Sequence, residues 1–311
     1  MTNLEEILKN LPELPEKIGH WSGKVVTLMG SIELTQRAIF KSMQGDKSNH
    51  QVVDKQNVEG VLRAELRGIK VITRIRDNML LDLRDIYNFD ADKKKQKNLF
   101  YAKSCRKNRL CGNCVACVSL GSLAPGAFSR RSRWFMPDMF SSTDADECVS
   151  GYANYEEEGV LNTVSTPSRK GESPSSRSSS SYATYEYVKP GTVFPFKIMI
   201  RDPSKYDVFA AIKTLNDVGQ VDGIGAYSSR NGRFRIKIYA IAGSVPLNNA
   251  SNFDLASKDS WMKDIPSLFP ENSKIFKVED SDSLISEAFT RYNNLLNNAD
   301  WKKFIEPKTK E

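Results

Sequence analysis

Histidine is scarce in this chain of 311 residues, which has two, His20 and His50. Both lie far in the sequence from the cysteines, and no serine stands in the glycine pattern of a nucleophile elbow. The sequence also lacks a Walker phosphate loop and a Rossmann glycine fingerprint. These absences argue against proteases, other hydrolases and nucleotide-dependent enzymes, so we expect a protein without catalytic activity.

Long apolar runs are absent as well. No segment approaches the roughly 18 uninterrupted apolar residues that cross a bilayer. The chain starts MTNLEEILKNLPELPEK, which is acidic and interrupted by proline where a signal peptide is basic and then apolar. With 40% hydrophobic and 27% charged residues, the chain can still bury a core. We therefore expect a cytoplasmic protein without a membrane partner.

Positive charge is in excess and is unevenly placed. The chain has 45 basic and 38 acidic residues, a net charge of +7 and a pI of about 9.0. Residues 251–311 hold nine Lys or Arg and eleven Asp or Glu, so the basic excess belongs to the first 250 residues. This distribution is typical of a protein that binds an anionic partner such as nucleic acid, although a solvated surface would also produce it.

Hydrophobic periodicity predicts a mixture of helices and strands. The expected helices span residues 3–11, 203–218 and about 281–298, and the expected strand regions are 24–40, 58–76 with a bend at Gly68, 183–201 and 233–240. Residues 118–136 are expected to form a surface loop, and Gly219 to Gly225 a turn. A strand, a helix, a glycine loop and a strand in this order resemble half of a ferredoxin-like or RNA-recognition-motif (RRM) sheet, with the first half in residues 24–76. The predicted fold class is therefore α+β.

Four of the five cysteines lie in the segment CRKNRLCGNCVAC, residues 105–117. Cys105, Cys111, Cys114 and Cys117 have the spacing C-x5-C-x2-C-x2-C, in which two-residue gaps let neighbouring thiolates converge on one ion. Four thiolates leave a tetrahedral zinc ion no open position, so we expect one structural zinc per chain.

Other roles for these cysteines remain open. An iron–sulfur cluster also uses four thiolates, but the gap of five and the missing Cys-Pro make it less favoured. Disulfides are disfavoured in a cytoplasmic protein with an odd number of cysteines, and unliganded thiols are a further alternative. Cys148 stands alone and is expected to be a free thiol.

Basic residues gather beside glycines and aromatics in three places. The three groups are Arg130, Arg131 and Arg133 before Trp134; Arg230, Arg233 and Arg235 around Gly232; and Lys103, Arg106, Lys107 and Arg109 in the cysteine segment. Lys and Arg at such positions bind phosphates, and aromatic faces stack on unpaired bases. Three such groups in the basic part of the chain favour nucleic-acid binding.

The order of these features carries a resemblance to a known family. The cysteine segment is followed by STPSRKGESPSSRSSSS (165–181), which has nine serines in seventeen residues. EYVKPGTVFPFKIMIRDP, a helix and IGAYSSRNGRFR then lie within residues 186–235. Together these motifs, over about residues 20–245, resemble the RAMP-type backbone subunit of the type I-D CRISPR Cascade complex.

The resemblance implies an RRM-like core with a zinc-binding insertion and a flexible thumb-like excursion. The predicted parts are a lead-in (1–23), the core (24–99 and 183–245), the zinc-binding insertion (100–137), the thumb (138–182) and a C-terminal packing segment (246–311). It also implies that copies of the protein polymerise along a crRNA, together with other Cascade subunits, and present the guide to target DNA or RNA in antiviral defence. The implied RNA contacts are Arg130, Arg131, Arg133, Arg169, Lys170, Arg177, Ser228, Ser229, Arg230 and Arg233.

Two alternatives belong to other classes of protein. Related backbone subunits cut target RNA with a loop aspartate, for which Asp77, Asp144 and Asp146 are the candidates. A zinc-containing DNA-binding protein is the other alternative, but no helix-turn-helix or C2H2 spacing supports it. The sheet segment RFRIKIYA lacks the aromatic pair on which RRM domains stack bases, so we expect binding through loops.

Overall fold

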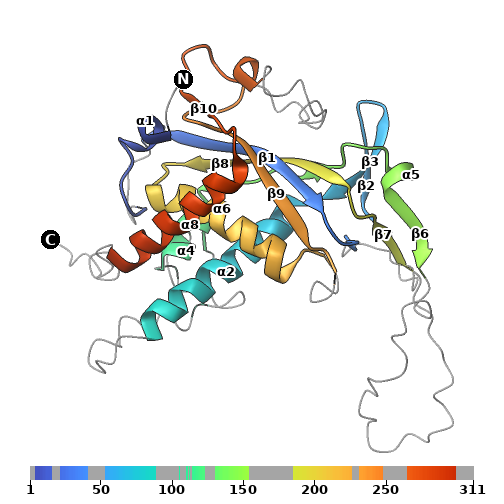
Figure 1. Cartoon of the computed structure of the whole chain (residues 1–311), viewed down its shortest axis with the longest axis horizontal. Coiled ribbons are helices and arrows are strands. Elements are labelled where there is room, and N and C mark those ends of the chain that lie inside the picture. Colours follow the sequence, from blue (N-terminus) through green and yellow to red (C-terminus); the bar gives the residue numbers. More distant parts are fainter. Residues whose placement is uncertain are drawn as a thin grey trace, which may run out of the picture.

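The computed structural model describes most of the chain (Figure 1). The described residues are 4–15, 22–40, 53–88, 105, 110, 112, 114–122, 130–153, 185–225, 231–247 and 265–298. The serine-rich segment that was predicted to form a flexible thumb lies outside them. Among the described residues, no helix is long and apolar enough to cross a membrane.

A five-stranded antiparallel sheet forms the centre of the fold. Its strands, in spatial order, are β10 (Ile275–Lys277), β9 (Phe234–Ala242), β1 (Val25–Leu34), β8 (Val193–Arg201) and β4 (Trp134–Phe135). Mixed helices and antiparallel strands confirm the predicted α+β class.

Two crossing connections organise this sheet. The chain runs from β1 through α2 (Gly68–Asn88) to β4, with β8 between the two strands. It then runs from β8 through α6 (Lys205–Asp217) to β9, with β1 between them. The helices α2 and α6 contact each other and lie with α8 (Ser281–Asn298) on one side of the sheet (Figure 1). We call this side the helical face.

Alternation along the strands separates the two faces. Phe194, Phe196, Ile198 and Ile200 of β8 belong to the main hydrophobic core, together with apolar residues of α2 and α6. On the opposite face, a smaller cluster joins Met29, Ala240 and Ala242 to Ile265 and Phe269. Ile265 begins the short 3-10 helix η5 (Ile265–Leu268), which covers one part of this second face.

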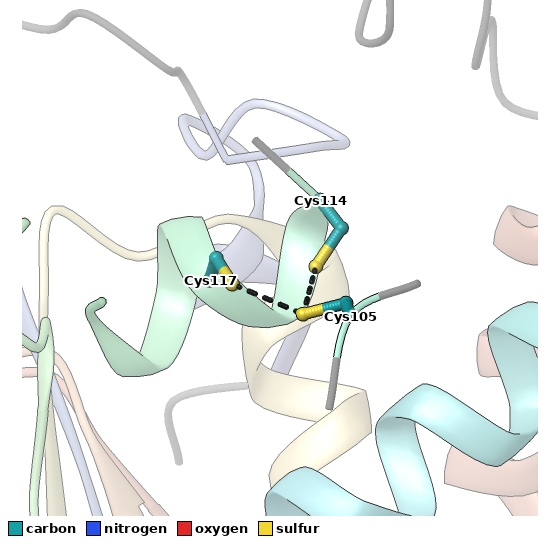
Figure 2. Close-up of side chains that lie close together, drawn as sticks. All are labelled: Cys105, Cys114 and Cys117. Carbon is teal, nitrogen blue, oxygen red and sulfur yellow. Dashed lines mark hydrogen bonds between the residues drawn. The ribbon is translucent and has the colours of Figure 1, made fainter. Parts of the chain in front are cut away.

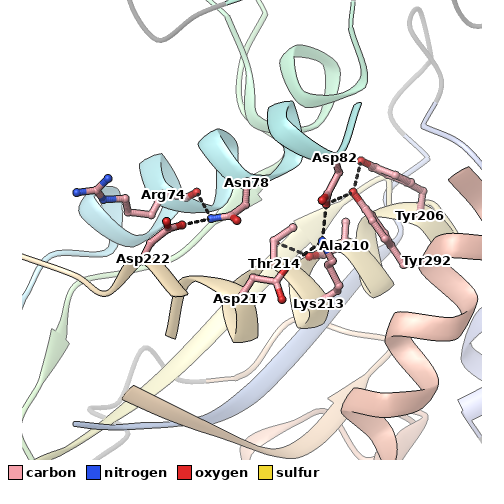
Figure 3. Close-up of polar contacts among 10 residues, drawn as sticks. All are labelled: Arg74, Asn78, Asp82, Tyr206, Ala210, Lys213, Thr214, Asp217, Asp222 and Tyr292. Carbon is pink, nitrogen blue, oxygen red and sulfur yellow. Dashed lines mark hydrogen bonds and ion pairs between the residues drawn. The ribbon is translucent and has the colours of Figure 1, made fainter. Parts of the chain in front are cut away.

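A polar junction joins the three helices (Figure 3). The Lys213 ammonium of α6 lies 2.7 Å from carboxylate oxygens of both Asp82 in α2 and Asp217. The hydroxyl of Tyr292 in α8 donates to Asp82 at 2.9 Å and lies 3.3 Å from the Tyr206 hydroxyl. The junction holds α8 against the core, in the part of the chain that was expected to pack outside the sheet.

Two smaller sheets lie beyond the main one. The first joins β2 (Lys55–Val58), β3 (Val61–Leu66) and β5 (Met139–Phe140), and the second pairs β6 (Val149–Ala153) with β7 (Tyr185–Val188). The short helix α5 (Ala145–Cys148) precedes β6. Because Ala38 pairs with Val188, the second small sheet adjoins the C-terminal end of β1.

Several predicted elements are confirmed. Helix α1 (Leu4–Leu8) buries Leu4, Ile7 and Leu8, β1 carries a bulge between Met29 and Gly30, and α8 covers the predicted span. The turn between β7 and β8 contains Gly191 at a φ of 82°, which a residue with a side chain rarely adopts. The predicted helix at 203–218 is α6, and a Ser204 to Asp207 capping box starts it.

The predicted strand region at 58–76 was wrong beyond its bend. Strand β3 ends at Leu66, and the helix α2 begins at Gly68 and continues to Asn88. The β-branched residues of this segment suggested a strand. Buried residues at helical spacing outweigh that local preference; they are Val71, Ile72, Ile75, Met79 and Leu83. Strand β3 belongs to a separate sheet, and the next strand of the main sheet after β1 in the chain is β4.

The predicted surface loop at 118–136 was also partly wrong. Val118 and Leu120 are buried in the helix α4 (Val115–Leu120), and Trp134 is buried in β4. The Ser119 hydroxyl donates a hydrogen bond to a buried acceptor. The small polar residue at this position therefore reflects an internal hydrogen bond and not exposure to solvent. The predicted turn from Gly219 begins with a π-helical turn, Val218–Asp222.

Candidate metal centre and nucleic-acid contacts

Three cysteines converge at the start of α4 (Figure 2). The Sγ atom of Cys105 lies 3.5 Å from that of Cys117 and 3.7 Å from that of Cys114. All three side chains are buried. The fourth predicted ligand, Cys111, lies outside the described residues.

The sulfur separations match metal coordination better than a disulfide. Zinc–sulfur bonds of about 2.3 Å in a tetrahedron place the sulfurs about 3.8 Å apart, whereas a disulfide joins them at about 2.05 Å. Among the described cysteines, which are Cys105, Cys114, Cys117 and the separate Cys148, no disulfide is present. Three soft donors that meet in one buried place can hold a metal ion, and the thiol chemistry suits zinc or iron.

The chain around this cysteine cluster is held by backbone pairing. Cys114 occupies the N-terminal cap position of α4, and Gly121 follows the last helical residue; a Cβ atom on Gly121 would lie 2.7 Å from the Ser132 nitrogen. Ser122 and Arg130 exchange two backbone hydrogen bonds of 2.9 and 2.7 Å. These contacts hold the segment that begins at Arg130 beside α4 and its cysteines.

Asp207 joins the cysteine cluster to the core. Its buried carboxylate accepts hydrogen bonds from the Ser119 hydroxyl of α4 at 2.5 Å and from the Trp134 indole at 3.1 Å. The amide and hydroxyl of Ser204 donate to its other oxygen at 3.0 and 2.6 Å. One side chain thus connects α4, β4 and the first turn of α6.

The first predicted arginine group lies beside the cysteine cluster. The Arg130 guanidinium donates from Nε to the Gly112 carbonyl at 2.9 Å, and Arg133 donates to the Asp202 carbonyl at 3.3 Å. Burial lowers the pKa of Arg130, Arg133 lowers it further, and Cys117 opposes the change. Arg131 is the exposed member of the group. Arg130 and Arg133 therefore have structural contacts in addition to their predicted RNA contacts.

Arg233, from the second predicted group, lies where the glycine loop enters β9. Its Nη1 atom is buried and has no hydrogen-bond partner within the described part of the chain. Its carbonyl accepts from the backbone amides of Thr35 and Gln36. The preceding Gly232 has a φ of 76°, and a Cβ atom there would overlap the Ile224 carbonyl. The loop geometry therefore requires glycine at position 232.

The two arginine groups lie at opposite ends of the main sheet. Val25 pairs with Arg201 at the end near Arg133, and Leu34 pairs with Phe234 at the other end, beside Arg233. The ten residues of β1 span about 30 Å between these ends. The other predicted RNA contacts lie outside the described residues; they are Arg169, Lys170, Arg177, Ser228, Ser229 and Arg230.

The aspartates of the ribonuclease alternative occupy regular structure. Asp77 lies within α2, although it was predicted to lie in a loop, and Asp146 lies within α5. Asp144 caps α5 by accepting a hydrogen bond from the Asp146 amide at 3.0 Å. Helix capping therefore accounts for Asp144, while Asp77 and Asp146 are helical residues.

Lys197 was not among the predicted site residues, although its position is unusual for a lysine. It lies in β8, is 4% exposed, and is the one cation within the segment VFPFKIMI. A charged residue at an interior position of an otherwise apolar strand was the sequence signal that could have identified it.

Comparisons with known proteins agree on one family. No curated protein matches the chain. Among solved structures, the crystal structure of Csc2 from Thermofilum pendens aligns with a TM-score of 0.62 at 14% identity, over 97% of this chain and 94% of that one. This likeness shows a shared fold. The family of CRISPR proteins described as "Csc2 Crispr" matches residues 39–310, which is most of the chain. The expected relation to CRISPR Cascade subunits is thereby confirmed, and the chain belongs to the Csc2 family.

Proposed function

We propose that this Csc2-family protein is a non-catalytic subunit that binds crRNA and polymerises along it as the backbone of a type I-D Cascade complex. The observation that carries the proposal is the buried Nη1 atom of Arg233, which has no acceptor within the described part of the chain. Buried guanidinium groups normally have hydrogen-bond partners. A phosphate oxygen of the guide supplies one at this place.

The position of Arg233 supports the same role. Its backbone is fixed by Thr35 and Gln36, and the adjacent Gly232 amide donates to the Arg37 carbonyl at 2.8 Å. A rigid backbone beside a free guanidinium atom can hold a phosphate without a large loss of conformational entropy. Ser228, Ser229 and Arg230 extend this contact in the proposal, and Arg169, Lys170 and Arg177 form a second contact from the thumb.

The core of the proposed subunit is RRM-like. Strands β9, β1, β8 and β4 follow the order 4-1-3-2 of a ferredoxin-like sheet, and α2 and α6 are its two crossing helices. The helices bury one face of the sheet. Guide RNA therefore contacts loops at the sheet ends or the opposite face.

Zinc is the metal in this proposal, with one ion per chain. Cys105, Cys111, Cys114 and Cys117 would hold it, and the bound ion would supply a closed, structural cross-link without a catalytic position. The ion would then stabilise the core as well, because the hydrogen bond from Ser119 to Asp207 connects α4 to α6.

Binding of single-stranded RNA at several salt concentrations tests this function. The wild-type protein should bind with a steep salt dependence, and each lost phosphate contact reduces the logarithmic salt slope by about 0.7 for a single strand. Arg233→Ala should show that reduction. Lys9→Ala, which removes an exposed charge directly after α1, should leave the slope unchanged.

Two results would overturn the proposal. Saturable one-to-one binding to a particular DNA duplex would favour the DNA-binding alternative. Cleavage of target RNA by the assembled complex, abolished by alanine at Asp77, Asp144 or Asp146, would make the subunit a ribonuclease.

A further inference from the structure

The face of the main sheet opposite the helices carries a buried cation. Lys197 lies on this second face, because the flanking Phe196 and Ile198 point into the main core and its cross-strand partner Met29 belongs to the second-face cluster. The residue is 4% exposed. Its ammonium group makes no hydrogen bond or ion pair within the described structure.

An unpaired ammonium in this position is unfavourable in the protein alone. Lysine is almost never fully buried unless it is paired, since desolvation of the charge costs free energy. In agreement, burial lowers the pKa of Lys197, and no neighbouring carboxylate opposes that shift. An anionic group beside Lys197 would offset this cost.

An exposed aromatic ring lies on the same face. Trp134 and Phe135 form β4; Trp134 points to the helical face, where its indole reaches Asp207, so Phe135 points to the second face. Phe135 is 53% exposed and pairs with Met199, two residues from Lys197. Strand spacings place the Cα atoms of Phe135 and Lys197 about 8 Å apart.

Further polar groups continue this surface across β1 and β9. Lys237 pairs with Ser31, and Arg235 pairs with Glu33, so these side chains share the face of Lys197. Arg235 and Lys237 are exposed, and the Ser31 hydroxyl lies 2.6 Å from that of Tyr239. Glu33 is the one carboxylate among these six strand residues. The surface is thus basic, with hydroxyl groups beside the cations.

We infer that this second face binds a nucleotide of a single-stranded nucleic acid, with its phosphate at Lys197 and its base stacked on Phe135. A cation beside an aromatic platform is how single strands are held without sequence preference. An acidic protein segment would satisfy Lys197 but would give the exposed ring no flat partner. The inference rests on the proposed RNA-binding function. It adds a base-stacking site on the sheet, whereas the sequence predicted binding through loops.

Two substitutions separate the two contacts. Phe135→Leu keeps an apolar residue at an exposed position and should weaken binding of a uridine homopolymer about 5- to 150-fold, with an unchanged salt slope. Lys197→Met keeps the apolar stem, and should weaken binding with a loss of about 0.7 from the salt slope. Lys9→Met is the control for net charge, and should change neither quantity.

Thermal unfolding without RNA provides an independent readout. Lys197→Met should raise the melting temperature in chloride, because it removes an unpaired buried charge. Inorganic phosphate at matched ionic strength should stabilise the wild-type protein and not Lys197→Met. If that variant is more stable but binds RNA as the wild type does, the inference is wrong. If the variant is less stable, Lys197 has a structural role and the inference is equally wrong.

Failure of the proposed function gives a different pattern. A wild-type protein that binds no single-stranded RNA, yet is stabilised by phosphate through Lys197, contradicts the crRNA-binding proposal while the anion site stands. Wild-type RNA binding that survives both Phe135→Leu and Lys197→Met contradicts the nucleotide site and leaves the proposed function intact.

Discussion

The hydroxyl of Ser119 donates a 2.5 Å hydrogen bond to the carboxylate of Asp207, and both side chains are fully buried. Ser119 belongs to α4, which follows directly on Cys114, whereas Asp207 is in the first turn of α6. The cysteine cluster is therefore connected by one polar contact to the helix that crosses the main sheet. Through this contact, we expect that loosening the cysteine cluster also loosens the start of α6, and the reverse.

Asp207→Ala should destabilise the fold strongly. It removes the acceptor of Trp134, Ser119 and Ser204 at once and leaves their donors buried, so we expect a loss of about 3 kcal/mol or more in the free energy of unfolding. Ser119→Ala removes one donor and should cost about 1–2 kcal/mol. Urea unfolding of both variants measures the difference. Equal losses would mean that Asp207 acts through Ser119 alone.

Metal removal should loosen the cysteine cluster. Cys114→Ser or Cys117→Ser replaces a soft thiolate ligand, and should lower both the metal content and the melting temperature. Chelation should have the same effect on the wild type. Cys148→Ser provides the matched control, because Cys148 is buried outside the cluster and should retain about one zinc per chain.

Elemental analysis decides the identity of the metal. One zinc ion per chain without visible absorbance is the expected result. Iron with visible absorbance would instead indicate an iron–sulfur cluster, and a metal-free protein with an unchanged melting temperature would contradict a metal site.

Local sequence patterns predicted the helices and strands whose buried residues recur at one regular spacing. The helix α6 has Tyr206, Phe209, Ile212 and Leu215 on one face and a capping box at its start, so periodicity and capping agree. In β9, Phe234, Ile236 and Ile238 alternate with exposed cations. The spacing of the cysteines likewise indicated that Cys105, Cys114 and Cys117 would meet.

Contacts between distant parts of the chain were not predictable in this way. Residues 68–76, the first turns of α2, were predicted to be a strand because they are rich in β-branched side chains. Strand β4 has two residues, too few for a periodic signal. Phe135 shares a face with Lys197 only because β4 pairs with β8, whose partner residues lie 64 and 66 positions later in the chain. The candidate nucleotide site therefore depends on register, which no local pattern determines.

The helix junction should depend on the Tyr292 hydroxyl. Tyr292→Phe keeps the ring, but removes both the hydrogen bond to Asp82 and the contact with the Tyr206 hydroxyl, so we expect a loss of about 1–2 kcal/mol in unfolding free energy. Tyr206→Phe is the matched control, since it removes the longer 3.3 Å contact between two hydroxyls and should cost less. Urea unfolding compares the two variants. A greater cost for Tyr206→Phe would contradict the central place of Asp82 in the junction.

Lys213 and Lys197, the two lysines that are buried in the described part of the chain, should respond to pH with opposite signs. Burial lowers the pKa of Lys213, but hydrogen bonds and charges from Asp217 and Asp82 outweigh it and raise the pKa above 10.5. Its stabilising contribution, measured against Lys213→Met, is then complete below 10.5 and disappears as the pH rises through the raised value.

Lys197 has the opposite sign, because burial lowers its pKa below 10.5 without a compensating carboxylate. Between that lowered value and 10.5, the unfolded chain binds more protons than the folded protein, so stability rises with pH. The wild type should therefore be less stable than Lys197→Met near neutral pH and approach it as the pH rises towards 10.5. Unfolding free energies from roughly pH 8 to pH 11 measure both trends. Parallel pH curves for the wild type and Lys197→Met would show that Lys197 titrates alike in both states, and would remove the electrostatic reason for an anion at this site.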